Sequence, residues 1–473
     1  MKKLLSLTLA VIMILSLCAC GGSGNETPSE PEAPKLELGF GKINITPNYS
    51  VGLGGSGNDK TRRSTGLVSY VYATCLAFRQ NGELYLVYTI DTLSVNDELA
   101  DLCRAEIIKQ IPEVKPEHIY LAATHCHSAP SPYWSDNSPE GKYRGEFINY
   151  MPQAAKAALK DLAPATMEFA QFDLEGMKFV RHYIAADGSY AGNNYGNQNI
   201  AYKEHTYDPD HEMILVNFPR EGKEPVMLVN WGAHPANPYD ASIGYYNLSS
   251  DHPGWCRDQL EKLTGAKVAY FNGASGDTVP DSRVVELKHG LNAKQYGLKL
   301  AELAYEHIGE LKAVEVDGIK TTGRDVELKI EHEKEHLLAE CEEIRHLYID
   351  LNDKATADAK AIALGLSSCH HATAIVSRAK LGATQLREVN GFRIGPMGFI
   401  THTYEMSSEH ADELKAAVAE DYPTVFILAG NNRYLPREEA IDQYTYEGNT
   451  RFYTRDAADV MVQNYVEMLG IVK

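Results

Sequence analysis

Short apolar runs that alternate with helical segments constrain the fold of this 473-residue chain more than any other feature. Runs of this kind, bounded by polar residues, are typical of buried strands. They lie at 84–90, 119–123, 213–218, 226–231, 268–271, 399–401 and 425–429, and helical periodicity appears at 97–110, 255–263 and 291–308. Interleaved strands and helices predict an α/β fold in which mixed sheets and helices form layers.

The pattern indicates one large domain. No internal repeat is detectable in the sequence, and no convincing linker follows residue 36. The hydrophobic content of 44% is sufficient for a sizeable core. The charged segment 331–360 has a polar helical pattern, which predicts an outer helical excursion that ends before Ser377.

Five of the apolar runs are followed directly by polar residues that can do chemistry. In open α/β sheets, ligand sites collect beyond the carboxyl ends of the strands, so these residues predict one composite site. The five stretches are 124–127, 232–235, 272–277, 402–405 and 430–434.

The residue types in these stretches favour a zinc site. His125 and His127 lie two residues apart, and side chains at that spacing share one face of an extended strand. A catalytic zinc needs about three nitrogen or oxygen ligands and an open position for water, whose pKa it lowers to about 7. We expect His125, His234 and Glu405 as ligands, with a phenolic oxygen from Tyr434. His127 would act beside the metal as a base or as a hydrogen-bond donor. Each residue alone also fits a structural role.

Other chemistries have weaker support. No G-x-S-x-G elbow, Walker A motif or dinucleotide fingerprint is present, and the serine of Gly273–Gly276 fails the elbow spacing. Cys369, His370 and His371 form a rival metal cluster beside the polar excursion. The formal charge of −19 argues against a nucleic-acid partner, because an acidic surface repels phosphate.

The N-terminus predicts a lipoprotein signal. Two lysines precede the apolar stretch Leu4–Leu17, a leucine stands three residues before Cys20, and a small residue comes directly before it. We therefore expect a signal peptide at 1–19, lipidation of Cys20, a flexible tether at 20–36 and a hydrolase domain at 37–473. The protein would be extracytoplasmic and lipid-anchored to the bacterial cell membrane. An ordinary secretory peptide cleaved nearby is the alternative.

Several motifs, taken in their order along the chain, resemble those of the catalytic domain of the neutral, non-lysosomal ceramidase family. The similarity covers nearly the whole chain from about Gly39. In the first half of the chain, Gly39–Pro47 resembles the family's G-x-G-x-x-D-I-T-P and Thr124–Pro130 resembles its T-H-T-H-S-G-P. Gly232–Pro235 resembles the H-P element, and Ser250, Asp251 and Gly254 resemble S-x-D. Further along, Ser275–Pro280 resembles G-D-V-S-P, and Tyr434 with Tyr446–Gly448 resembles the paired tyrosines.

The resemblance implies a zinc amidohydrolase that cleaves a ceramide-like N-acyl sphingolipid to a fatty acid and an amine base. His125, His234, a late glutamate and a tyrosine resemble the family's metal ligands, for which Glu405 and Tyr434 are the choices here. The catalytic groups that the resemblance implies beside the metal are His127, Tyr446 and, less securely, Arg181.

The chain departs from the family pattern in three ways. Val279 replaces the serine of G-D-V-S-P, which argues against a nucleophilic serine, and Asn44 replaces an acidic residue. We also expect the chain to lack the immunoglobulin-like C-terminal domain of typical ceramidases, which argues against ceramide as the substrate more than against zinc.

Two alternative functions stay open. The same metal site would suit a hydrolase of another amide or ester, and the fold would suit a non-catalytic lipoprotein that captures a lipid or glycan. The sequence leaves the acyl-chain preference and the oligomeric state unknown.

Overall fold

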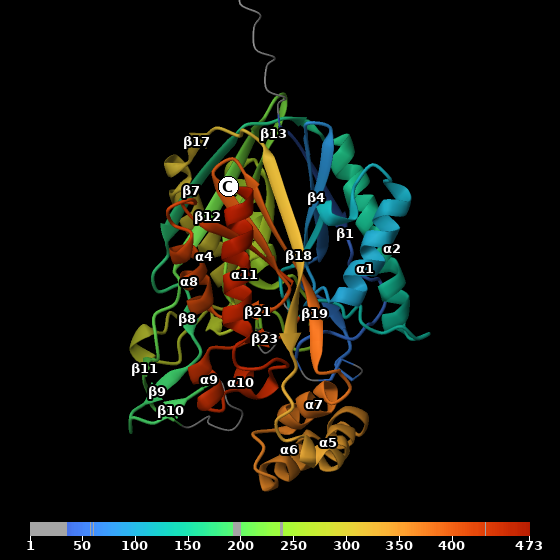
Figure 1. The fold of residues 1–473 in the computed structure, drawn as a ribbon, viewed down its shortest axis with the longest axis vertical. Helices are drawn as coiled ribbons and strands as arrows, with labels where there is room; N and C mark the ends of the chain where they lie inside the picture. The colour runs from blue at the N-terminus through green and yellow to red at the C-terminus, as the bar shows by residue number, and fades with distance from the viewer. Residues whose placement is uncertain (1–35, 57, 60, 193–199, 237–239, 431) are drawn as a thin grey trace, which may run out of the picture. The chain divides into compact units, whose positions relative to one another are not determined.

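Three mixed β-sheets, each covered by helices on one face, make up the body of the protein (Figure 1). The computed structural model describes residues 36–56, 58–59, 61–192, 200–236, 240–430 and 432–473. The signal peptide, Cys20 and all but the last residue of the expected tether therefore lie outside the described residues. The stretch from Lys35 to Lys473 forms one compact unit.

Each sheet contains the same order of elements: an antiparallel hairpin, a helix, and a strand parallel to the second hairpin strand. The first set is β3 (Tyr72–Gln80), β4 (Glu83–Ile90), α1 (Asp97–Gln110) and β5 (Ile119–Ala123). The second is β12 (Glu212–Arg220), β13 (Lys223–Trp231), α3 (Asp251–Thr264) and β15 (Lys267–Asn272). The third is β19 (Thr384–Ile394), β20 (Met397–His402), α8 (Ser408–Ala417) and β22 (Val425–Ala429). The repeat is one of topology, which the sequence does not reveal.

The remaining strands extend these sheets. The first sheet has the order β5-β4-β3-β1-β6, the second β15-β13-β12-β7-β17 and the third β18-β19-β20-β22. The added strands are β1 (Glu37–Asn44), β6 (Ala163–Pro164), β7 (Met167–Asp173), β17 (Lys312–Val314) and β18 (Ile319–Lys329). The hairpin of β3 and β4 turns at Asn81 and Gly82, both with positive φ, as a tight two-residue turn requires.

The inner faces of the three sheets share one core. Aromatic pairs join the sheets: Phe78 meets Phe218 at 5.6 Å between ring centroids, Phe271 meets Phe426 at 5.4 Å, and Tyr120 stacks on Phe392 at 4.6 Å. The outer faces pack against helices, which include α2 (Pro139–Lys160), α4 (Ala293–Glu306) and α11 (Ala457–Val472). Because both faces are covered, the central strands are apolar throughout rather than alternating. The expected α/β fold is confirmed.

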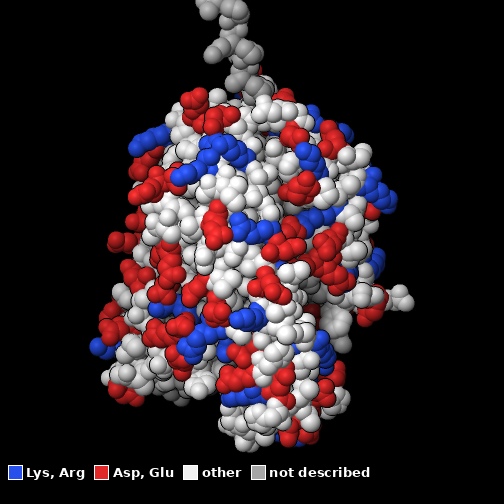
Figure 2. Space-filling view, in the orientation of Figure 1, with Lys and Arg blue, Asp and Glu red and all other residues white. Residues whose placement is uncertain are grey.

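A helical lobe interrupts the third sheet between β18 and β19. Its helices α5 (Leu338–Arg345), α6 (Lys354–Ala363) and α7 (Cys369–Arg378) enclose a small core of their own. The lobe lies at the bottom of Figure 1, and its surface carries charges of both signs (Figure 2). The excursion therefore ends at Arg378, later than expected, because α7 buries alanine, isoleucine and valine against the lobe.

Among the described residues, no helix is both long enough and apolar enough to cross a membrane.

Candidate metal centre

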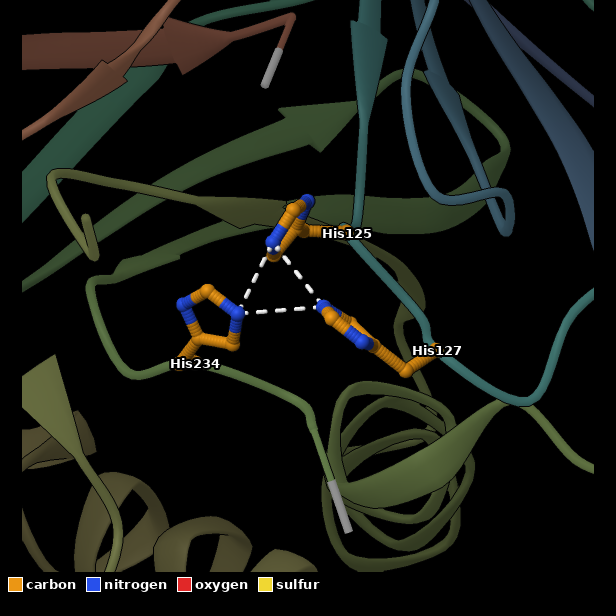
Figure 3. Close-up of side chains that lie close together, drawn as sticks. All are labelled: His125, His127 and His234. Carbon is orange, nitrogen blue, oxygen red and sulfur yellow. Dashed lines mark hydrogen bonds between the residues drawn. The ribbon is translucent and has the colours of Figure 1, made fainter. Parts of the chain in front are cut away.

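Loops that leave the strands β5 and β13 bring three histidines to one buried point (Figure 3). The Nε2 atom of His125 lies 3.0 Å from Nε2 of His234 and 3.2 Å from Nε2 of His127. The Nε2 atoms of His127 and His234 are 3.0 Å apart. None of the three side chains is more than 8% exposed. The three nitrogens therefore form a closed triangle away from bulk water.

The opposite ring nitrogens fix the orientation of these imidazoles. Nδ1 of His125 lies 2.8 Å from the Leu93 carbonyl oxygen, and Nδ1 of His234 lies 3.1 Å from the Ser275 carbonyl oxygen. A carbonyl only accepts, so both Nδ1 atoms carry the proton and both Nε2 atoms present lone pairs. Two lone pairs that face each other at 3.0 Å repel unless a cation lies between them.

The charge state of the rings points the same way. Burial, followed by the neighbouring His125, lowers the pKa of His127 and of His234 well below the ordinary value. Arg181 adds to the effect at both rings. The two imidazoles are consequently neutral at pH 7, which is the form that binds metal ions.

Glu405 supplies a carboxylate at the same place. It lies in β21 (Glu405–Met406), and its Oε2 atom is 3.3 Å from Nε2 of His125. Among the described residues this buried oxygen has no hydrogen-bond partner. In a tetrahedral site with zinc–ligand bonds of about 2.0–2.1 Å, neighbouring ligand atoms are about 3.3 Å apart. The observed spacings of 3.0–3.3 Å match that arrangement, so these residues fit a bound zinc.

The local backbone is strained at the centre. His125 has a φ of 63°, a left-handed conformation that residues with a Cβ rarely adopt. It lies two residues beyond the end of β5 rather than in the strand, so the two histidines converge through this turn and not through strand alternation. On the other side, Gly55 has a φ of 84°, and a Cβ there would lie 2.5 Å from Nδ1 of His127. Glycine at this position gives the ring its space.

A buried ion pair borders the histidines. Arg181 pairs with Glu447 at 2.7 Å and donates hydrogen bonds to the Gly276 carbonyl and, at 3.3 Å, to the hydroxyl of Tyr434. Burial alone would raise the pKa of Glu447, but Arg181 and His182 lower it to about 2. The guanidinium is therefore held in one place by a permanent negative charge.

Two tyrosines complete the surroundings. Tyr434, in β23 (Tyr434–Leu435), pairs in register with Glu405, and its ring meets Tyr446 of α10 (Tyr446–Thr450) at 5.6 Å between centroids. Burial, followed by the charge of Glu405, raises the pKa of Tyr434 well above its ordinary value. Its phenol is protonated at neutral pH.

The centre opens into a cavity of about 370 Å³. His125, His127, Glu405, Tyr434 and Tyr446 all line it. The opposite wall comes from α7 of the helical lobe, through His370, Thr373, Ala374 and Ser377. The segment that sequence patterns place outside the body is thus part of this cavity.

The structure brings together all seven residues expected at the site: His125, His127, His234, Glu405, Tyr434, Tyr446 and Arg181. It differs on the place of His127, whose Nε2 atom lies as close to the other two imidazoles as they lie to each other. His127 is therefore geometrically equivalent as a ligand and not simply adjacent.

Sequence reasoning missed Glu447 as the partner of Arg181, although it follows Tyr446 directly in a motif already noted. It also missed that residues of α7 and the side chain of Arg433 line the cavity. Because Arg433 directly precedes Tyr434 in the sequence, its place beside the site could have been predicted.

Comparison with solved structures identifies the fold. The chain is similar to neutral ceramidase from Pseudomonas aeruginosa, with a TM-score of 0.68, 15% identity, and coverage of 93% of this chain and 74% of that one. It is also similar to a ceramidase complexed with C2, with a TM-score of 0.66, 15% identity, and coverage of 93% and 75%. No protein-family model matches the sequence, and no curated protein matches it either. The chain has the fold of the neutral ceramidases, as its motifs implied.

Proposed function

We propose that this chain is a zinc-dependent hydrolase that cleaves a linear amide, with ceramide-like N-acyl lipids as the leading substrate class. The observation that carries the proposal is the convergence, on one buried point, of three imidazole nitrogens and a carboxylate oxygen that has no hydrogen-bond partner among the described residues. His125, His234 and Glu405 would hold the metal, with His127 and Tyr434 as the further candidate ligands. The ceramidase fold supports an amide as the bond cleaved.

Bound zinc would supply a Lewis acid that polarises an amide carbonyl and lowers the pKa of water. The contribution of the chain is to fix the three imidazoles through their Nδ1 contacts. Burial lowers the pKa of His127, so this ring is neutral at pH 7 and would serve as a ligand or as a hydrogen-bonding group beside the metal.

Arg181 and the tyrosines would stabilise negative charge on the substrate oxygen. Glu447 and the Gly276 carbonyl hold the guanidinium of Arg181, and its buried Nε has no partner among the described residues. Tyr434 keeps its phenolic proton and can donate it in a hydrogen bond. Donors fixed before the reaction stabilise an oxyanion without reorganisation.

The size of the cavity bears on the substrate. A volume of about 370 Å³ accommodates roughly a dozen water-sized groups at about 30 Å³ each. The amide and its nearest substituents fit, while long hydrocarbon chains would extend beyond the opening. Because the long chains of a ceramide would lie outside the cavity, a smaller amide or an ester is the second candidate substrate.

The test combines metal content with turnover. We expect one zinc per purified chain by elemental analysis, and hydrolysis of a fluorogenic N-acylsphingosine that is lost in a His125→Ala, His234→Ala variant. Absence of stoichiometric zinc would contradict the metal site, and equal turnover by both proteins would exclude these histidines from the reaction.

We also propose that Cys20 anchors the protein to the outer side of the bacterial cell membrane. The support is the sequence pattern around Cys20 alone. Metabolic labelling with an alkyne fatty acid should mark the wild-type chain and not a Cys20→Ser variant. Equal labelling of both, or release of wild-type protein into the medium, would reject the anchor.

A further inference from the structure

Arg433 projects into the same cavity as the metal-binding residues. Its backbone carbonyl accepts a hydrogen bond of 2.7 Å from the amide of Glu405, which fixes its position relative to that carboxylate. The side chain is exposed to solvent, yet burial lowers the pKa of its guanidinium. Both observations describe a group on the wall of a concave site, surrounded by protein but open to the cavity. An arginine remains cationic there.

Arg433 forms no ion pair among the described residues, although the charge of Glu405 favours its protonated form. Its guanidinium lies 4.1 Å from the ring centroid of Phe452, which holds it in place. Arg437, four residues later, lies at the same distance from the ring of Tyr207 but pairs with Glu409. The contrast shows that stacking alone does not satisfy an arginine in this segment.

The other lining residues do not neutralise Arg433. Glu405 is the acidic side chain among the residues that line the cavity, and it lies 3.3 Å from His125 Nε2, in the position of a metal ligand. The facing wall carries a histidine and the hydroxyls of Thr373 and Ser377. If Glu405 holds the metal as proposed, its carboxylate cannot also pair with Arg433, and the guanidinium is left for a ligand. A carboxylate that enters the cavity would form a charge-assisted pair of hydrogen bonds with it.

We propose that Arg433 selects the substrate by binding an anionic group, a carboxylate, on the amine side of the scissile amide. This inference rests on the proposed function and narrows it: the preferred substrate is an N-acyl amine that carries a carboxylate, such as an N-acyl amino acid, and uncharged N-acyl amines are cleaved more slowly. The planar guanidinium offers paired N–H donors that match a carboxylate. Hydrolysis adds water across the C–N bond and releases a fatty acid and the amine, and Arg433 takes no part in proton transfer.

The experiment uses substrates that differ in charge but little in size. Zinc-loaded protein is assayed with N-lauroylglycine, N-lauroylethanolamine and N-lauroyl-O-phosphoethanolamine. The wild type should prefer the glycine amide over the ethanolamine amide by at least about tenfold in kcat/KM. Arg433→Gln should lower kcat/KM for the glycine amide by about tenfold to a hundredfold, mainly through KM, and change the neutral amide less than about threefold. Arg433→Lys should recover part of the loss.

Arg283→Gln is the matched control. Arg283 is also an exposed arginine beside an aromatic ring, that of Tyr202, but it does not line the cavity. The variant changes the net charge equally and should leave all three activities unchanged. An equal loss for the charged and neutral amides in Arg433→Gln would overturn the proposal. Preference for the phosphate-bearing amide would overturn the assignment of a carboxylate.

A binding measurement separates this proposal from the proposed function. Calorimetric titration of dodecyloxyacetate, which has no amide to cleave, into zinc-loaded protein should give tighter binding to the wild type than to Arg433→Gln, with no such difference for the uncharged 2-dodecyloxyethanol. Charge-selective binding without any turnover would reject the hydrolase and keep the role of Arg433. Turnover without charge preference would reject the role of Arg433 and keep the hydrolase.

Discussion

The chain contains two histidine-rich clusters, and only one of them has the geometry of a metal site. His125, His127 and His234 aim their Nε2 atoms at one point from two separate loops. His370 and His371 are neighbours on α7, and they face different places. His370 lines the cavity beside the three-histidine centre and contacts Tyr446, whereas His371 lines a separate pocket with Arg378 and Arg451.

The difference shows that convergence, not the number of histidines, makes the site. Burial is the leading cause that lowers the pKa of His370 to about 4 and that of His371 to about 3, so these rings are also neutral at pH 7. Cys369 beside them is a buried thiol whose pKa burial raises to about 12. Consecutive residues on a helix point about 100° apart and cannot share a ligand position.

The strongest test of this comparison removes histidines from each cluster. His125→Ala with His234→Ala should abolish stoichiometric zinc and lower kcat/KM by about a thousandfold or more. His370→Ala with His371→Ala should keep one zinc per chain by elemental analysis. Loss of zinc from the second variant, with the fold intact by circular dichroism, would contradict the distinction.

The next test concerns the buried ion pair of Arg181 and Glu447, which borders the three-histidine centre. Glu447→Gln leaves Arg181 buried without its charge partner, so it should lower the free energy of unfolding by about 3–5 kcal/mol. It should also reduce kcat by about a hundredfold, because the guanidinium loses its fixed position. Urea unfolding and steady-state kinetics measure the two effects. Glu438→Gln, which removes an exposed partner of Arg455, is the control and should change stability by less than about 1 kcal/mol.

Tyr434→Phe sharpens the definition of the metal-binding set. If the phenolic oxygen is a ligand, as the sequence predicts, the Kd for zinc should rise about tenfold to a hundredfold, measured by competition with a chelating dye. Unchanged zinc affinity with a lower kcat would instead make Tyr434 a hydrogen-bond donor to the substrate. The exposed Tyr444 offers the control substitution, Tyr444→Phe, which should alter neither quantity.

The smallest expected effect is on the pH dependence of the free energy of unfolding, to which His371 of the second cluster contributes. The pKa of His371 is about 3 in the fold and about 6.5 in the unfolded chain, so the unfolded chain takes up a proton first as pH falls. The contribution of His371 to the free energy of unfolding is therefore complete above pH 6.5 and declines as the pH falls toward 3. Between pH 7 and pH 4.5, His371→Gln should therefore lose about 2 kcal/mol less stability than the wild type.

Urea unfolding of chelator-treated protein at the two pH values measures this difference. His336→Gln, at an exposed position in the same lobe, should behave like the wild type. A parallel decline in all three proteins would show that His371 takes up its proton in the folded state as readily as in the unfolded chain.

Much of the fold could be predicted because its signals are local. The apolar runs that became β4, β5 and β22 and the periodic segment of α1 match the observed elements closely. Most of the candidate site residues could be predicted because they follow strand ends, where polar groups of an α/β fold collect. Arg181 and Tyr446 were expected only from the motif resemblance. The ceramidase motifs predicted the same fold.

The rest depends on contacts between distant segments. The threefold repeat of topology leaves no trace in the sequence, since each copy packs different side chains into the shared core. The contribution of α7 to the cavity requires contact with α10, which lies about 70 residues further along the chain. The place of His127 depends on a left-handed turn at His125, and a histidine gives no local sign of such a turn.

The left-handed turn at His125 also has a cost in backbone strain. A left-handed φ costs a residue with a Cβ about 1–2 kcal/mol, and glycine adopts it without penalty. His125→Gly would remove this strain, but it would also remove the imidazole and its contact with the Leu93 carbonyl. The strained turn and the imidazole that converges on His127 and His234 therefore belong to the same residue, and a residue chosen to relax the backbone there would carry no nitrogen for the proposed metal.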